Sequence, residues 1–328
     1  MSNVRNTRYD VLRVFAIVLI VIMHSPRPDG GAPGYVLASL SYVTAPGLVL
    51  FFMLSGALLL DNKLSTSEFL KRRFSKVLWP TAFWTVVYML VKWFTEPYAM
   101  DALFRTVLSM PFSAQGHGIL WFMYTLAGLY LLTPILAKWL RASSKREIEF
   151  YLALWCITLS YPYLCQVLDI NQSRSGILYY FTGYVGYFVL GHYLKKYYIY
   201  RVLHVFIAIG IAVIIPVILY SSGIEFDFYS MLWYLSLPVA MMAFALFVLF
   251  SRLPEKHSSL LKSASKLSFG VYFVHILIMR QFVWRIDLVC MMPSILQIVT
   301  IVLLTLLLSY LCSWLLSRLP CSKYIIGV

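Results

Sequence analysis

Charged residues are scarce in this sequence. Asp, Glu, Lys and Arg make up 12% of the 328 residues, whereas hydrophobic residues make up 61%. A soluble globular domain has about a quarter charged residues and about half apolar ones, so this composition excludes that class. Intrinsic disorder is excluded as well, because 17% of the residues are aromatic and the long apolar runs must be buried. The composition indicates a polytopic membrane protein.

Several motifs and long connectors are also missing. No glycine pattern of the Walker or Rossmann type occurs, which argues against a nucleoside triphosphate or NAD as ligand. The five cysteines lack metal-ligand spacing, and we predict no metal. We interpret Cys156 and Cys312 as packing residues, whereas Cys165 and Cys290 lie near predicted outer ends and could pair in an oxidising compartment. No connector is longer than about 20 residues, which predicts one transmembrane domain over residues 1–328 without an appended soluble domain.

The apolar residues gather in ten segments, which predict an all-α bundle of about ten transmembrane helices. A spanning helix needs about 20 apolar residues, and the chain has room for about ten such segments. The segments are 11–27, 43–60, 77–95, 119–137, 148–168, 177–194, 202–220, 231–251, 267–284 and 293–317.

The positive charges predict the orientation of this bundle. If both termini and the even-numbered connectors share one side, the other side keeps only Arg27, Lys92, Arg105, Arg174, Arg280 and Arg285, and 21 of the 27 Lys and Arg residues lie on the first side. The 13 acidic residues divide 6 to 7 and show no such bias. Lys and Arg, but not Asp and Glu, favour the cytoplasmic side. We therefore predict that both termini are cytoplasmic. The net charge of +14 then reflects membrane topology and contact with anionic lipid, not nucleic-acid binding.

The first segment carries ionisable residues that are costly in a bilayer unless they are paired or hydrated. Asp10 and Arg13 lie at its inner end and His24 lies toward its outer end. The step from Arg13 to His24 is 11 residues, or about three helical turns and about 16 Å, so both side chains lie on one helix face. Either residue alone is compatible with an interfacial position. Their shared face favours a functional stripe.

A second polar stripe lies in the ninth segment. Ser268, Tyr272 and His275 follow at i, i+4 and i+7 and share a helix face. His275 is either bonded to a neighbouring helix or part of a polar cavity together with His24. His192 and His204 lie near inner ends, and we expect them to be interfacial or solvated.

The second connector is strongly basic. It contains Lys71, Arg72, Arg73 and Lys76 just ahead of Pro80. These cations either anchor the third helix to anionic lipid or bind the phosphates of a cytoplasmic cofactor. The tyrosines around Tyr179 and Tyr180 are most simply interpreted as interfacial and packing residues, although aromatic rings also form stacking surfaces for sugars.

Several of these pieces together resemble the acyltransferase-3 family of membrane acyltransferases, and more narrowly its WecH-type surface-polysaccharide O-acetyltransferases. The resemblance covers essentially the whole chain, and the matching motifs follow in the order of the family. They are the Asp-x-x-Arg of Asp10 and Arg13 with the Arg-x10-His spacing to His24, Phe51–Gly56, Arg72–Pro80, His117–Phe122, Tyr180–His192 and Ser268–His275. The basic motif departs from the family pattern, because Arg73 and Lys76 form Arg-x-x-Lys where Arg-x-x-Arg is common.

The resemblance implies transfer of an acyl group, usually acetyl, from cytoplasmic acyl-CoA to a hydroxyl of a glycan or lipid-linked saccharide at the outer face. His24 would act as general base or carry the acyl group as an acyl-imidazole. Asp10 would orient Arg13, and Ser55 or His275 would position the thioester carbonyl. The implied catalytic residues are His24, Arg13, Asp10 and His275. The implied acetyl-CoA ligands are Arg13, Lys71, Arg72, Arg73, Lys76 and Ser55, and the implied acceptor ligands are His117, Trp121 and Tyr272.

Two other functions fit the composition. A transporter or flippase for a lipid-linked saccharide would line its pathway with Arg13, His24 and His275, but we find no internal repeat, and the basic connector suits an anionic cofactor. A non-catalytic scaffold of a polysaccharide synthase leaves the spacing of Arg13 and His24 unexplained. The sequence leaves open the acceptor sugar, the length of the acyl group and the oligomeric state, including a homo-oligomer.

Overall fold

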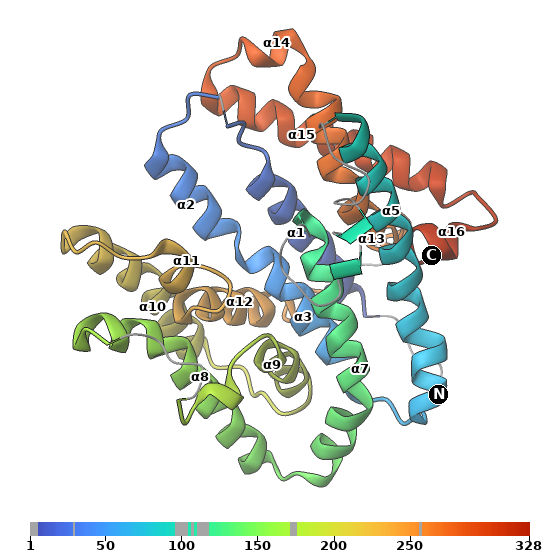
Figure 1. Cartoon of the computed structure of the whole chain (residues 1–328). Helices are drawn as coiled ribbons and strands as arrows, with labels where there is room; N and C mark the ends of the chain where they lie inside the picture. Colours follow the sequence, from blue (N-terminus) through green and yellow to red (C-terminus); the bar gives the residue numbers. More distant parts are fainter. Residues whose placement is uncertain are drawn as a thin grey trace. The chain divides into compact units, whose positions relative to one another are not determined.

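The computed structural model describes residues 6–28, 30–95, 104–105, 108–109, 118–170, 176–255 and 258–328. Every regular element within these ranges is helical, as the sequence predicts (Figure 1). The five cysteines are free thiols, so the suggested pairing of Cys165 with Cys290 is not formed.

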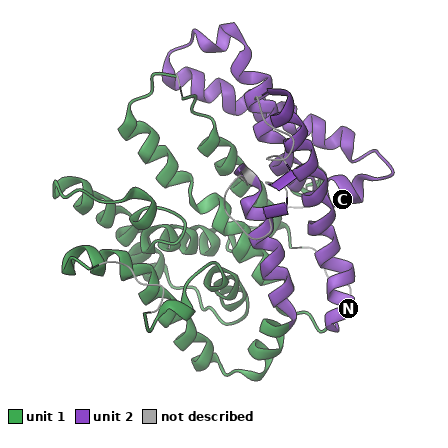
Figure 2. Cartoon of the chain, in the orientation of Figure 1, with its two compact units in different colours: residues 1–63, 135–265 green, residues 64–134, 266–328 purple. Residues whose placement is uncertain are grey.

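The chain divides into two compact units, Met1–Lys63 with Ile135–Ser265, and Leu64–Pro134 with Lys266–Val328 (Figure 2). Two of the three points of division lie within long helices, α7 (Trp121–Ala142) and α13 (Ser259–Gln281). The first unit also holds α1 (Thr7–His24), α2 (Gly34–Thr44), α3 (Pro46–Leu59), α8 (Lys145–Leu168), η3 (Tyr179–Phe181), α9 (Val185–Lys196), α10 (Val202–Ser221), α11 (Phe228–Met231) and α12 (Leu237–Phe250). The second holds α4 (Thr66–Phe69), η1 (Leu70–Phe74), α5 (Ser75–Thr95), η2 (Gly118–Leu120), η4 (Val283–Arg285), α14 (Asp287–Cys290), α15 (Ser294–Leu316) and α16 (Ser322–Ile325).

Seven of the described helical stretches are long and apolar enough to cross a membrane. They are Gly34–Leu59, Thr66–Thr95, Trp121–Ala142, Lys145–Leu168, Val202–Ser221, Ser259–Arg285 and Ser294–Leu316. Three of the ten predicted segments form helices that are too short or contain too many charged residues to count among these seven. Helix α1 contains Arg8, Asp10 and Arg13 within 18 residues. Helices α9 and α12 have 12 and 14 residues, which rise about 18 and 21 Å against a hydrocarbon thickness of about 30 Å.

Glycines allow α1, α3 and α9 to pack backbone against backbone. A Cβ added at Gly56 of α3 would lie 1.8 Å from the Phe188 carbonyl oxygen of α9, and one added at Gly191 would lie 1.9 Å from the Met53 carbonyl oxygen. A Cβ at Gly47 would approach the Ala16 carbonyl oxygen of α1 to 2.9 Å. Small residues permit such close approach between membrane helices. The Phe51–Gly56 motif therefore has a packing role at its final glycine.

An ion pair joins the ends of α3 and α9. Lys195 Nζ donates to Asp61 Oδ2 and to the Ala57 carbonyl oxygen, both at 2.8 Å. His192 Nδ1 lies 3.4 Å from Asp61 Oδ1. The expectation that His192 is interfacial or solvated is wrong, because its side chain is only 1% exposed. The close packing of α9 on α3 covers the ring, although its sequence position is near a helix end.

Aromatic side chains hold the second unit together. The rings of Trp84 (α5) and Phe273 (α13) stack with centroids 5.9 Å apart. Tyr88 donates its hydroxyl to the Phe273 carbonyl oxygen at 2.7 Å, and Trp84 Nε1 donates to the Ile325 carbonyl oxygen at 2.8 Å. Burying aromatic area while satisfying each polar tip fixes α5, α13 and α16 as one body.

Candidate functional site

The N-terminal half of α1 carries a buried carboxylate that a serine links to an arginine. Asp10 is 4% exposed, and Ser265 Oγ donates to its Oδ1 at 2.5 Å. Arg13 Nη1 donates to Ser265 Oγ at 3.3 Å and lies 4.0 Å from Asp10 Oδ1. A buried carboxylate needs such partners to offset its lost hydration. The predicted pairing of Asp10 with Arg13 is therefore present, and Ser265 bridges it.

Ser265 was not predicted from the sequence, although the sequence contains a signal for it. Ser265 precedes Ser268, Tyr272 and His275 by three, seven and ten residues on α13, so it extends the predicted stripe by one turn. Its partner Asp10 is 255 residues away. Only the fold identifies which polar residue of another helix meets Asp10.

His24, the last residue of α1, has a defined arrangement of ring nitrogens. Its Nδ1 lies 2.8 Å from the Ile20 carbonyl oxygen. Because a carbonyl oxygen only accepts, Nδ1 must donate, and in the neutral ring Nε2 then carries the lone pair. The imidazole is half-buried. Nε2 is thus the nitrogen that could take a proton or attack a carbonyl carbon.

His275 has the same arrangement of nitrogens in the second unit. Its Nδ1 donates to the Tyr272 carbonyl oxygen at 2.6 Å, so Nε2 carries the lone pair in the neutral ring. The side chain is fully buried, and its ring centroid lies 5.8 Å from that of Tyr272. Tyr272 in turn packs on Phe122 of α7 with centroids 5.2 Å apart. The predicted residue Trp121 begins α7 and is half-buried, whereas His117 lies outside the described residues.

The basic connector folds into a π-helical turn, η1, between α4 and α5. The turn carries Lys71, Arg72 and Arg73, and Lys76 follows at the start of α5; all four side chains are exposed. Arg72 makes an ion pair with Glu68, 3.7 Å apart, one turn back. A capping box starts this stretch, because Ser65 accepts from the Glu68 N–H and the Glu68 carboxylate accepts from the Ser65 N–H. A π-turn inserts an extra residue per turn and often occurs at functional sites. The sequence did not indicate it.

The predicted site residues are distributed over both units. Asp10, Arg13, His24 and Ser55 belong to the first, and Ser55 is half-buried on α3. The four cations of 71–76, Trp121, Tyr272 and His275 belong to the second. Direct contacts among them are described for Asp10 with Arg13 and for Tyr272 with His275.

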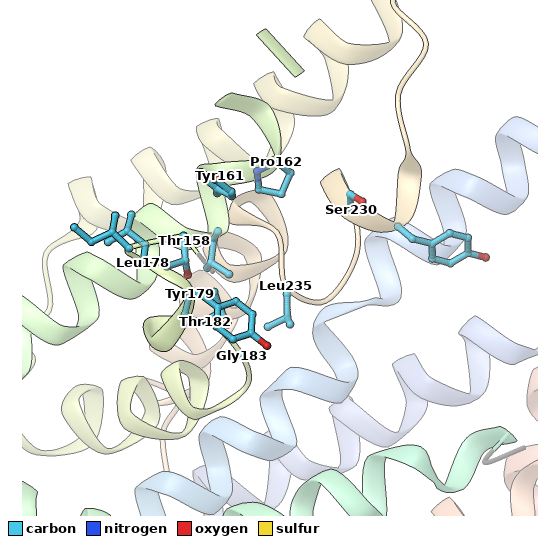
Figure 3. A pocket seen from close by; sticks show the side chains of 13 residues that line it. Thr158, Tyr161, Pro162, Leu178, Tyr179, Thr182, Gly183, Ser230 and Leu235 are labelled. Carbon is cyan, nitrogen blue, oxygen red and sulfur yellow. Dashed lines mark hydrogen bonds between the residues drawn. The ribbon is translucent and has the colours of Figure 1, made fainter. Parts of the chain in front are cut away.

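Two cavities of the first unit were not predicted. One, of about 470 Å³, lies between α8, the η3 segment and α11, and Figure 3 shows Thr158, Pro162, Tyr179, Thr182 and Ser230 around it. The other, of about 370 Å³, has Lys145, Arg201 and His204 in its lining together with the aromatic residues Tyr193, Tyr197, Tyr198 and Phe244. Both have volumes typical of ligand sites.

These observations define an all-helical membrane protein with an Asp–Ser–Arg cluster around a buried carboxylate and with two histidines whose Nδ1 atoms donate to backbone carbonyls. A family model for an acyltransferase domain, of the acyltransferase-3 type, matches residues 6–314. The chain therefore belongs to the acyltransferase-3 family, and its domain implies acyltransferase activity. Comparisons with curated proteins and with solved structures found no match.

Proposed function

We propose that this protein is an O-acetyltransferase of a bacterial inner membrane. It takes the acetyl group from cytoplasmic acetyl-CoA and places it on a hydroxyl of a cell-surface glycan or lipid-linked saccharide. The observation that carries the proposal is the arrangement of α1 in an acyltransferase-3 domain. Ser265 hydrogen-bonds the guanidinium of Arg13, and His24 presents Nε2 as its basic nitrogen. The resemblance of the sequence motifs to WecH-type enzymes supports a surface-polysaccharide acceptor.

The donor side uses cations. CoA carries a diphosphate and a 3′-phosphate, and Arg binds phosphate oxygens in a bidentate manner. The exposed side chains of Lys71, Arg72, Arg73 and Lys76 supply charge for these phosphates. Arg13, aligned by Asp10 through Ser265, would bind another part of the donor, and Ser55 or His275 would position its thioester carbonyl.

The chemical step centres on His24 Nε2. As the acceptor oxygen attacks the thioester carbon, the imidazole takes the hydroxyl proton, the new C–O bond forms and the C–S bond breaks. The thiolate of CoA then receives the proton and leaves as the thiol. Alternatively, Nε2 itself attacks the thioester carbon, the C–S bond breaks and CoA leaves as the thiolate. The acceptor hydroxyl then attacks the acyl-imidazole, the C–N bond breaks, and the hydroxyl proton passes to the thiolate, which leaves as the thiol. The hydrogen bond from Nδ1 to the Ile20 carbonyl would stabilise the positive ring in both routes.

The helix geometry suits a donor on one side and an acceptor on the other. Arg13 and His24 lie about 16 Å apart along α1, which is comparable with the length of the pantetheine arm of CoA. With Arg13 near the cytoplasm, this arm would bring the thioester toward His24. The acetyl group would then cross the membrane while still bound to its carrier.

The test measures CoA binding and acetyl-CoA turnover by the purified protein. We expect His24→Ala to retain CoA binding and its thermal stability but to lose turnover at least about a hundredfold, because general-base catalysis contributes about 10²–10⁴. Arg73→Ala should mainly weaken CoA binding, while Arg146→Ala, an exposed cation at the start of α8, should not. If Arg201→Ala weakens CoA binding and Arg73→Ala does not, the phosphates bind in the 370 Å³ cavity instead. A folded protein that binds no CoA would favour the transporter.

A further inference from the structure

The cavity of Figure 3 lies where two short helices begin. Its lining includes Thr182 and Gly183, just before α9, and Leu235, just before α12. These helices are about 12 and 9 Å shorter than the hydrocarbon layer, whereas the neighbouring α8 has 24 residues and is long enough to cross it. Non-helical backbone at membrane depth is tolerated where it is buried in protein or lines a cavity. The predicted orientation places this end of α8, α9 and α12 on the outer side.

The lining combines aromatic rings with hydrogen-bonding groups. Tyr161, Tyr179 and Tyr229 supply rings, and Thr158, Thr182 and Ser230 supply hydroxyls. Pro162, inside α8, has no N–H to give to the carbonyl of Thr158, four residues before it. That carbonyl is released from the regular helical bond beside the cavity. Rings with a few placed polar groups are typical of a site for a small polar ligand.

A second, more polar compartment adjoins the first. Its volume is about 320 Å³, and it shares Pro162 and Ser230 with the larger cavity. Its lining adds Gln166 and the carboxylates of Asp169 and Asp227. Among the described lining residues of both compartments there is no Lys or Arg. The negative charge of the two carboxylates disfavours binding of phosphate groups, and hence of CoA. Carboxylates do readily accept hydrogen bonds from hydroxyls.

The walls of the two compartments are held in place without a ligand. Trp155 Nε1 donates to the Gly183 carbonyl oxygen at 3.0 Å and fixes the chain ahead of α9. The Tyr163 hydroxyl donates to the Met231 carbonyl oxygen, and Gln166 Nε2 donates to the Glu225 carbonyl oxygen at 3.0 Å. These bonds tie the end of α8 to the segment around α11. A preformed site loses less conformational entropy on binding.

We propose that the joined compartments between α8, η3 and α11 bind an uncharged saccharide ring of the acceptor, stacked on Tyr179 or Tyr229 and hydrogen-bonded at Asp169, Asp227 and the Thr158 carbonyl. The apolar C–H face of a pyranose suits the electron-rich face of a tyrosine ring, and its hydroxyls suit the acceptors of the second compartment. This site rests on the proposed function for its role as the acceptor site. Its chemistry as a saccharide site stands on the lining alone.

The test uses the full chain in phosphatidylcholine nanodiscs, because a sugar-headed detergent would compete. Saturation-transfer NMR is recorded with methyl glucoside and with methyl glucuronide as probes. The variants are Tyr179→Ala, which removes an aromatic ring from the lining, and Leu235→Trp, which fills the cavity. The matched control is Tyr180→Ala, because Tyr180 is adjacent in sequence but 87% exposed and absent from the lining. CoA binding is measured on the same samples.

We expect the wild type and Tyr180→Ala to show saturation transfer to the methyl glucoside ring protons. Tyr179→Ala should weaken this binding about five- to tenfold, the effect of losing one aromatic stack, and Leu235→Trp should abolish it. Methyl glucuronide should bind more weakly, because its carboxylate meets Asp169 and Asp227.

The two measurements, methyl glucoside binding and CoA binding, distinguish a failure of the saccharide site from a failure of the proposed acetyl transfer. No binding of methyl glucoside to the wild type, or equal binding to every variant, overturns the saccharide site while intact CoA binding leaves the proposed function standing. Saccharide binding that depends on Tyr179, in a protein that binds no CoA, supports the site and overturns the proposed acetyl transfer.

Discussion

Ser265 shows how one hydroxyl connects residues that the family motif places in a single helix. Its hydroxyl donates to Asp10 and accepts from Arg13, so it connects the buried carboxylate to the guanidinium through two hydrogen bonds. The direct distance from Arg13 to Asp10 is 4.0 Å, at the limit of an ion pair. The orientation of Arg13 therefore depends on a residue of α13, outside the Asp-x-x-Arg motif.

Replacement of this serine should affect the donor side selectively. We expect Ser265→Ala to destabilise the protein by about 1–3 kcal/mol, since Asp10 loses a donor in a buried place, and to raise the KM for acetyl-CoA more than it lowers kcat. Ser263→Ala, at an exposed position of the same helix, is the control. A change in kcat alone would show that Arg13 is not oriented toward the donor.

Asp61 should give the stability an acid dependence. Burial raises its pKa, but the hydrogen bond from Lys195 and the charges of Lys195, His192 and Lys196 outweigh burial and hold the pKa below its usual value. The stabilisation is therefore fully present above the unfolded pKa of about 4 and is lost as the pH falls through the folded value.

Thermal unfolding followed by tryptophan fluorescence between pH 6 and 3 checks this. The wild type should lose more stability below about pH 4 than Asp61→Asn, which has no titrating carboxyl. Parallel melting profiles for the two proteins would mean that the Lys195 pair contributes nothing.

At the scale of elements, glycine positions decide which helices meet. Helices α3 and α9 approach so closely that neither Gly56 nor Gly191 has room for a methyl group. The order of apolar segments along the chain does not predict this contact, because the two helices lie more than a hundred residues apart. Helix length behaves similarly. Residues 177–194 are apolar enough for a span, but Gly183, at φ 97°, and the short turn η3 precede α9, which has only 12 residues.

Adding one methyl group should separate α3 from α9. We expect Gly56→Ala to lower the midpoint of thermal unfolding markedly, because the new Cβ would have to displace the Phe188 backbone and overpacking costs about 1–3 kcal/mol. Gly210→Ala is the matched control, since its Cβ would have nothing within 4 Å and alanine is the better helix former. Equal melting temperatures for the two variants would contradict the close packing.

At the scale of the molecule, the charge distribution predicts a testable topology. In a variant lacking the five native cysteines, Ser143→Cys reports on the α7–α8 connector and Ser222→Cys on the residue after α10. We expect a membrane-impermeant maleimide to label Ser222→Cys on intact cells, and Ser143→Cys only after permeabilisation. The reverse labelling pattern would show that the protein has the opposite orientation in the membrane, with Arg13 on the outer side.

The membrane character, the all-helical class and the family followed from the sequence alone, because apolar content and local motifs act over short stretches of chain. Each of the ten apolar segments contains a helix, but the bounds are less well predicted: α9 begins at Val185, eight residues after the start of segment 177–194. The sequence also indicated the pairing of Asp10 with Arg13, one turn apart on one helix. The three-dimensional fold was needed to show that Ser265 bridges this pair, that His192 is buried, and that a cavity lies beside α8 where the short helices α9 and α12 begin. Those features depend on contacts between residues distant in sequence, and a local pattern does not specify which side chains will meet.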